Sequence, residues 1–178
     1  MIKLIALDLD GTLLNSEKRV TPYTRDVLRR AMARGVHVTL ATGRMIGGAA
    51  YFGRQVGVNA PLICCNGGVV QGMDAPEPLF MRCLPQETVR RLLTLCHARG
   101  WYANWYIGRE IFVEHFDAIT GRQALFCGFN QLHRLRERDG RRAFERRGIL
   151  QVLAFDLGRA ETAFYVDHRI QAHHLPAA

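Results

Sequence analysis

Lysine is almost absent from this chain of 178 residues, in which Lys3 and Lys18 are the only two. No apolar stretch approaches the length of about 20 residues that a membrane-spanning helix needs. The apolar run at the N-terminus is too short for a signal peptide and lacks a small-residue cleavage site. The five cysteines are odd in number, and Cys64 and Cys65 are adjacent, which argues against a disulfide framework. We therefore expect a cytoplasmic protein without a membrane partner.

The formal net charge of +8 is carried almost entirely by arginine. Much of it lies between Arg134 and Arg147, where acidic residues are interleaved. This pattern is typical of a solvated helical face, and a phosphate-binding surface is the alternative. Because no recognisable nucleic-acid module accompanies the charge, we expect no nucleic-acid partner. The contents of 48% hydrophobic and 22% charged residues are those of a globular protein.

The first twelve residues combine a mostly apolar run with two acids. Ile2 to Leu7 predicts a strand buried on both faces, as in a parallel sheet. Asp8 and Asp10, two apart in extended chain, are expected to point the same way, and Gly11 allows a sharp turn after them. Open α/β sheets bind ligands at the carboxyl ends of their strands. Two carboxylates there need a compensating cation, and hard oxygen ligands suit Mg²⁺.

A second strand is expected to bring further polar groups to the same edge. Thr21-Pro22 predicts the start of a helix that ends at Gly35. Val36 to Ala41 predicts a strand parallel to the first, so that Thr42 lies at the same sheet edge as Asp8. The Thr42 hydroxyl and the Gly43 N–H would then face an anion bound at the acids. A turn that merely starts a helix is the alternative for this segment.

The next segments predict one more core strand and a hairpin. A helix is expected to reach about Val56, and Leu62 to Cys65 predicts a third buried strand. Asn66, which follows it, either lines the pocket or belongs to a plain hairpin turn. Cys64 and Cys65 fit small core residues better than reactive thiols. Val69 to Met81 predicts a hairpin.

From Leu84 the pattern changes to helix, hairpin, basic helical stretch and strand. Leu84-Pro85 begins a helix that Gly100 ends, and two aromatic-rich strands are expected on either side of Gly108-Arg109. A mostly helical stretch to Arg147 and a strand from Ile149 to Phe155 follow. The hairpin aromatics Trp101, Trp105 and Tyr106 either face a substrate or, as we favour, pack against the helices.

Three motifs resemble those of the haloacid-dehalogenase-like (HAD) superfamily, in its Cof-type phosphatase branch. Asp8-Leu9-Asp10-Gly11-Thr12 resembles the first motif, D-x-D-G-T/V. Ala41-Thr42-Gly43-Arg44 resembles the second, and Asn66-Gly67-Gly68 resembles a further N-G-A/G segment. The resemblance implies an α/β fold with a Rossmann-like parallel-sheet core, here residues 1–82, and an inserted α+β cap, here residues 83–178, both incomplete.

The resemblance also implies a chemistry. Asp8 would be the nucleophile and Asp10 the general acid and base, both at a Mg²⁺ ion. The residues implied in phosphate or substrate binding are Leu9, Thr42, Gly43, Arg44 and Asn66. The implied function is a Mg²⁺-dependent phosphohydrolase that acts on a small phosphorylated metabolite, such as a sugar phosphate, through an aspartyl-phosphate.

The chain departs from the family pattern after residue 155. The family's third-motif lysine and its fourth motif, G-D-x-x-x-D/N, are absent, since no lysine follows Lys18 and no Gly-Asp dipeptide occurs. We expect a chain that lacks the C-terminal part of the family's sequence, and its last stretch, Asp167 to Ala178, matches no cap strand that we recognise. Ile2 to Leu7 would then be an exposed edge, and the chain would either pair this edge with another copy or exist as a poorly stable fragment. An inactive truncated member and a phosphomutase-like phosphotransferase are the alternative functions.

Overall fold

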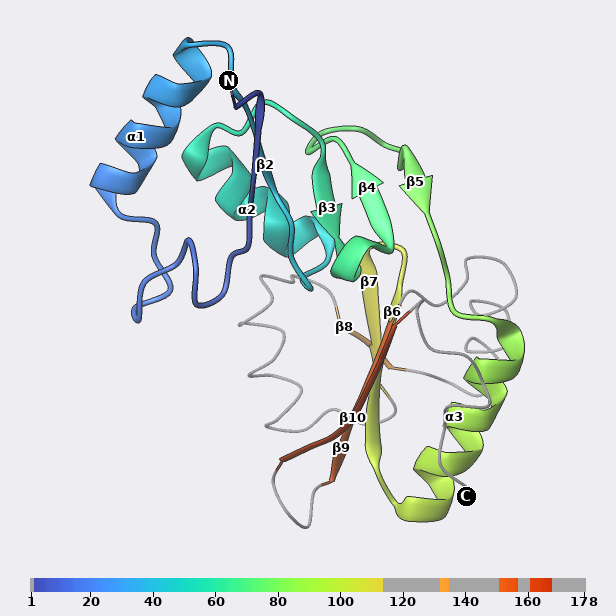
Figure 1. The fold of residues 1–178 in the computed structure, drawn as a ribbon. Coiled ribbons are helices and arrows are strands. Elements are labelled where there is room, and N and C mark those ends of the chain that lie inside the picture. Colours follow the sequence, from blue (N-terminus) through green and yellow to red (C-terminus); the bar gives the residue numbers. More distant parts are fainter. Residues whose placement is uncertain (1, 114–131, 135–150, 157–160, 168–178) are drawn as a thin grey trace. The chain divides into compact units, whose positions relative to one another are not determined.

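The computed structural model describes residues 2–113, 132–134, 151–156 and 161–167 (Figure 1). The chain divides into two compact units, Met1–Met81 and Arg82–Ala178, and each is described by itself. Within the described ranges, no helix has the length and apolar character needed to cross a bilayer.

The first unit is built on parallel strands joined by helices. β1 (Leu4–Leu7) pairs in parallel with β2 (His37–Leu40), with Leu4 opposite His37 and Leu7 opposite Leu40. A parallel bridge between Ala41 and Ile63 joins β2 to β3 (Leu62–Cys64). The carboxyl ends of these strands therefore lie at one edge, which confirms that the first two strands are parallel, as predicted.

The burial expected for the first strand is wrong. β1 alternates between exposed and half-buried residues, and Leu4 is 56% exposed and Ile2 70% exposed. β2, by contrast, buries three of its four residues. Among the described strands, β1 pairs only with β2, so its outer edge has no strand beside it there. An apolar run predicts a strand, but the strands and helices around it determine how deeply it is buried.

Two helices connect these strands. α1 (Pro22–Ala33) begins as predicted, because the Thr21 side chain accepts a hydrogen bond from the Thr24 N–H and Pro22 is the first helical residue. α2 (Ile46–Val56) ends at Gly57, which adopts a left-handed backbone conformation. The two helices contact each other and both contact β2, so they cover the same face of the sheet (Figure 1).

An antiparallel extension completes the first unit. A single 3₁₀ turn, η1 (Cys65–Gly67), follows β3 and leads into β4 (Val69–Gln71). β4 pairs antiparallel with β3 and with β5 (Phe80–Met81), which confirms the predicted hairpin. Cys64 and Cys65 are both buried, as expected of core residues.

The described residues of the second unit form one helix and a five-stranded sheet. α3 (Gln86–Arg99) is followed by the hairpin of β6 (Tyr102–Ile107) and β7 (Glu110–Val113). The remaining strands are β8 (Leu132–Arg134), β9 (Gln151–Asp156) and β10 (Glu161–Asp167), in the spatial order β10-β9-β6-β7-β8. All neighbours are antiparallel except β7 and β8.

The aromatic side chains of this segment lie mainly in the hydrophobic core of the second unit. Trp105 is fully buried in a cluster with Leu92 and Cys96 of α3, and Trp101 packs against that cluster. Tyr106 is also buried. For Trp101 and Trp105 these contacts agree with packing against the helix, which is the interpretation that we favoured.

The end of the chain differs from the prediction. β10 is a strand that no sequence pattern had indicated, and it pairs with β9 along nearly its full length. β8 lies within the stretch predicted to be mostly helical, and the rest of that stretch lies outside the described residues.

Candidate active site

The first motif forms a tight turn directly after β1. β1 ends at Leu7, and the Leu13 N–H donates to the Asp8 carbonyl oxygen at 3.2 Å. The Leu14 N–H donates to the Leu9 carbonyl oxygen at 2.9 Å, and Gly11 takes a φ of +81° that glycine adopts without strain. Because the extended chain ends before Asp8, strand alternation does not set the directions of the two acids.

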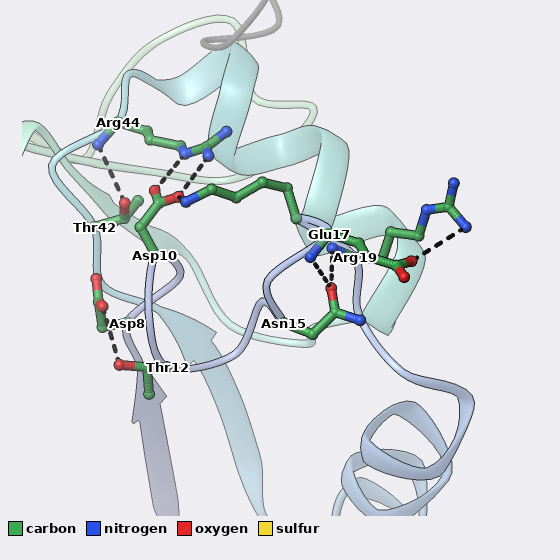
Figure 2. A network of polar contacts seen from close by, with 9 residues as sticks. Asp8, Asp10, Thr12, Asn15, Glu17, Arg19, Thr42 and Arg44 are labelled. Carbon is green, nitrogen blue, oxygen red and sulfur yellow. Dashed lines mark hydrogen bonds and ion pairs between the residues drawn. The ribbon is translucent and has the colours of Figure 1, made fainter.

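The two acids contact different partners (Figure 2). The Thr12 hydroxyl donates to Asp8 Oδ2 at 3.1 Å. Asp10 faces Arg44, whose Nε donates to Oδ2 at 2.7 Å and whose Nη2 donates to Oδ1 at 2.8 Å. Lys18 Nζ donates to the same Oδ1 at 3.0 Å. Asp8 is thus held by a hydroxyl, whereas Asp10 is held by two cations.

Arg44 is fixed from several sides. Its side chain is only 8% exposed, and its guanidinium carbon lies 5.1 Å from the centre of the Phe52 ring. Its N–H donates to Thr42 Oγ1 at 3.2 Å, and its carbonyl oxygen accepts from the Cys65 N–H at 3.0 Å. A planar guanidinium that is stacked and bidentate has little freedom to move. It therefore sets the position of Asp10.

The cations also set the charge of Asp10. The hydrogen bonds from the Arg44 guanidinium hold the pKa of Asp10 below its ordinary value, although partial burial acts in the opposite direction. The Lys18 ammonium adds to the lowering. Asp10 is accordingly a carboxylate at neutral pH in the free protein.

Thr42, Gly43 and Asn66 come together at the ends of β2 and β3. The Asn66 N–H donates to the Thr42 carbonyl oxygen at 3.1 Å, and the Thr42 N–H donates to the Ile63 carbonyl oxygen at 2.9 Å. A Cβ on Gly43 would lie 3.0 Å from Asn66 Oδ1, so only glycine fits there without displacing the amide. The backbone at Cys65 and Asn66 is left-handed, with φ of +51° and +54°. Such strain is often found at functional sites.

The structure thus brings the first-motif and second-motif residues to one sheet edge. The side chain of Leu9 is fully buried, which leaves only its backbone to face a ligand. Thr42 is also buried, and its Oγ1 accepts the Arg44 N–H. Sequence reasoning missed Lys18, which lies beyond the motif and which no recognised pattern singles out. The near absence of lysine from the chain was the only signal available.

Asp8 and Asp10 differ in how well they suit a magnesium site. Asp8 is exposed and offers hard carboxylate oxygens, whereas both oxygens of Asp10 already accept from cations. No group of three His, Cys, Asp or Glu side chains that could hold a metal occurs among the residues with described positions. Mg²⁺ often binds through one or two carboxylates and keeps several waters, and the exposed Asp8 carboxylate fits such a site. Arg44 and Lys18 compete with a metal ion for the oxygens of Asp10.

A family model for haloacid dehalogenase-like hydrolases matches residues 5–154. The chain belongs to this family. The match includes both motif loops and ends close to the point, about Phe155, at which the sequence resemblance was expected to stop. It also confirms the resemblance to the HAD superfamily on which the roles of Asp8 and Asp10 depend.

Individual HAD relatives agree with this assignment. The chain is 38% identical over 136 residues to the 5-amino-6-(5-phospho-D-ribitylamino)uracil phosphatase YwtE of Bacillus subtilis, a match that covers 74% of this chain and 41% of that protein. It is 29% identical over 113 residues to the pyridoxal phosphate phosphatase YbhA of Escherichia coli, which covers 64% of this chain and 42% of that protein. The fold matches that of a HAD subclass IIB sugar phosphatase with a TM-score of 0.71 and 21% identity, over 89% of this chain and 60% of the other.

The curated relatives are consistently longer than this chain. The chain spans 40%, 36% and 43% of the first curated relatives that it matches. These HAD relatives therefore contain further sequence that has no counterpart in the chain described here.

Proposed function

We propose that this chain supplies the phosphoryl-transfer residues of a phosphatase for small phosphate esters such as sugar phosphates. We assign the first unit to a Rossmann-like HAD core and the second to an inserted α+β cap. The observation that carries the proposal is the parallel pairing of β1 with β2, which places Asp8, just after β1, and Thr42, just after β2, at the same end of the two strands. This is the edge at which α/β sheets bind ligands.

In the first step, an Asp8 carboxylate oxygen attacks the phosphorus of the ester. The bond from phosphorus to the ester oxygen breaks. Asp10, which is a carboxylate in the free protein and takes up a proton when the phosphate ester binds, gives that proton to the departing alkoxide. The products are an aspartyl-phosphate on Asp8 and a free alcohol. Carboxylate nucleophiles of this kind divide phosphoryl transfer into two easier steps.

In the second step, Asp10 takes a proton from a water molecule, whose oxygen attacks the phosphorus. The bond to Asp8 breaks, inorganic phosphate leaves, and both side chains return to their initial states. The Thr42 hydroxyl and the backbone N–H groups of Leu9 and Gly43 are suited to the equatorial phosphoryl oxygens. A bound Mg²⁺, held by Asp8 and by Asp10 once its cations shift, would supply charge neutralisation for the phosphoryl group.

The choice of substrate class rests on the relatives. Two similar proteins are phosphatases of a phosphorylated ribityl compound and of pyridoxal phosphate, and a third is a sugar phosphatase. All three names describe monoesters of small polar alcohols. We therefore place the substrate in that class.

Hydrolysis of p-nitrophenyl phosphate tests the proposal. The wild-type chain should release nitrophenol in the presence of Mg²⁺ and should stop when the metal is chelated. Asp8→Asn keeps the shape of the side chain but removes the attacking charge, so its activity should vanish. Asp26→Asn is the matched control, because Asp26 is an exposed α1 residue that pairs with Arg30 on that helix.

Two other results would favour the alternatives. Mg²⁺-dependent binding of phosphate without any turnover would identify a non-catalytic member of the family. Transfer of the phosphoryl group to a sugar hydroxyl in preference to water would identify a phosphomutase-like enzyme.

A further inference from the structure

Asp10 is bound by two cations of different kinds. One carboxylate lies between two cations, since Arg44 contacts both of its oxygens and Lys18 contacts Oδ1. The neighbouring Glu17 carboxylate pairs with Arg19 at 3.7 Å (Figure 2).

The two cations differ in accessibility. Arg44 is 8% exposed and stacked over Phe52, whereas the Lys18 side chain is 47% exposed. An arginine held in this way positions the carboxylate, and it cannot easily turn toward a ligand. An ammonium on a flexible, half-exposed stem can shift to a second anion while it stays close to the first.

The loop directs Lys18 toward Asp10 through an unusual backbone. Lys18 takes a φ of +58°, in the left-handed region that side chains other than glycine seldom adopt. The Asn15 side chain accepts hydrogen bonds from the N–H groups of Glu17 and Arg19, and the Lys18 N–H donates to the Asn15 carbonyl oxygen. The turn therefore holds a strained residue at the place from which its ammonium reaches Asp10.

We propose that Lys18 is a specificity-determining residue, which selects phosphate esters whose leaving group carries a negative charge close to the ester oxygen. The proposal rests on the proposed function, in which Asp10 gives its proton to that oxygen. The leaving group must then lie beside Asp10, and Lys18 Nζ is 3.0 Å from an oxygen of Asp10. A carboxylate on the carbon next to the ester oxygen would meet the ammonium there.

Equilibrium binding tests the proposal without requiring turnover. Carboxymethyl phosphate and ethyl phosphate present the same phosphoryl group, and only the first adds a carboxylate. Calorimetric titration of the wild-type chain should show about three- to fivefold tighter binding of carboxymethyl phosphate, which is the size that an exposed ion pair supplies. Lys18→Gln should bind the two esters equally, and Lys18→Arg should keep the preference.

Lys3→Gln is the matched control, because Lys3 is the only other lysine and lies before β1. This variant should retain the wild-type preference. Equal binding of the two esters by the wild-type chain, or an equal loss for both esters in Lys18→Gln, would overturn the proposal. Failure of the proposed function is a separate result, namely no Asp8-dependent hydrolysis, and the binding preference can be measured in either case.

Discussion

Arg44 binds Asp10 through two parallel hydrogen bonds, Nε to Oδ2 at 2.7 Å and Nη2 to Oδ1 at 2.8 Å. The contact joins the loop after β1 to the loop after β2, so it connects the first motif to the second. Charge-assisted bidentate pairs of this type are among the stronger hydrogen bonds in proteins and fix geometry as well as charge. We therefore regard Arg44 as a positioning residue for the acid, in addition to any contact with phosphate.

Replacement of Arg44 by lysine should weaken the site although the charge is kept. Lysine cannot form both bonds or stack on Phe52 as a planar group does, and Arg44 is nearly fully buried. We expect a loss of about 1–2 kcal/mol in the free energy of unfolding, measured by urea titration. Arg54→Lys is the control, because Arg54 pairs with Asp74 at 2.7 Å on an exposed surface and should change stability little. Equal losses in the two variants would contradict the positioning role.

Arg44 should lower the pKa of Asp10 more than Lys18 does. Its pKa is lowered chiefly by Arg44 and to a smaller extent by Lys18, so Arg44→Met should raise the pKa more than Lys18→Gln. A folded-state pKa below the unfolded value adds stability above the unfolded pKa, and this contribution is lost as the pH falls through the folded pKa. Carboxyl-carbon NMR, with Asp10→Asn for assignment, measures each value. A larger rise in Lys18→Gln would show that the exposed cation dominates.

Substitutions at Gly43 and Asn66 should have coupled effects on the free energy of unfolding. Gly43→Ala places a methyl group 3.0 Å from Asn66 Oδ1, which must move, so the variant should be destabilised by about 1 kcal/mol or more. In an Asn66→Gly background the obstacle is gone and glycine suits the left-handed backbone, so the same change should cost much less. A double-mutant cycle of unfolding free energies measures the coupling. Additive losses would mean that the amide is not the group that Gly43 accommodates.

Much of the first unit could be predicted because its signals are local. The Thr21-Pro22 cap, the apolar run of β2 and the order of strand and helix are each encoded within a few residues. The burial of β1 could not be predicted in this way, because it depends on what lies beside the strand. The contact of Lys18 with Asp10 depends on a left-handed turn stabilised by Asn15, and no short pattern indicates that turn. β10 was missed because its sequence resembles no motif that we recognised.

The exposed first strand should promote self-association. Ile2 and Leu4 are largely exposed, and among the strands that the structure describes β1 has a partner on one side only. We expect the isolated chain to form edge-paired oligomers or aggregates. Leu4→Lys should shift it toward the monomer in size-exclusion chromatography with light scattering. Tyr23→Lys removes another exposed apolar residue, on α1, and should not have this effect. A monodisperse wild-type monomer would contradict the expectation.

The central claim is that Asp8 carries the phosphoryl group. Acid quenching during turnover of a phosphate ester, followed by pepsin digestion at an acidic pH at which an acyl phosphate survives, yields a peptide that contains Asp8. Mass spectrometry should find this peptide with one added phosphoryl group, and fragmentation should place the group on Asp8. Asp8→Asn should give no such species. Phosphoryl transfer to another residue, or steady hydrolysis with no modified peptide at any quench time, would contradict the account.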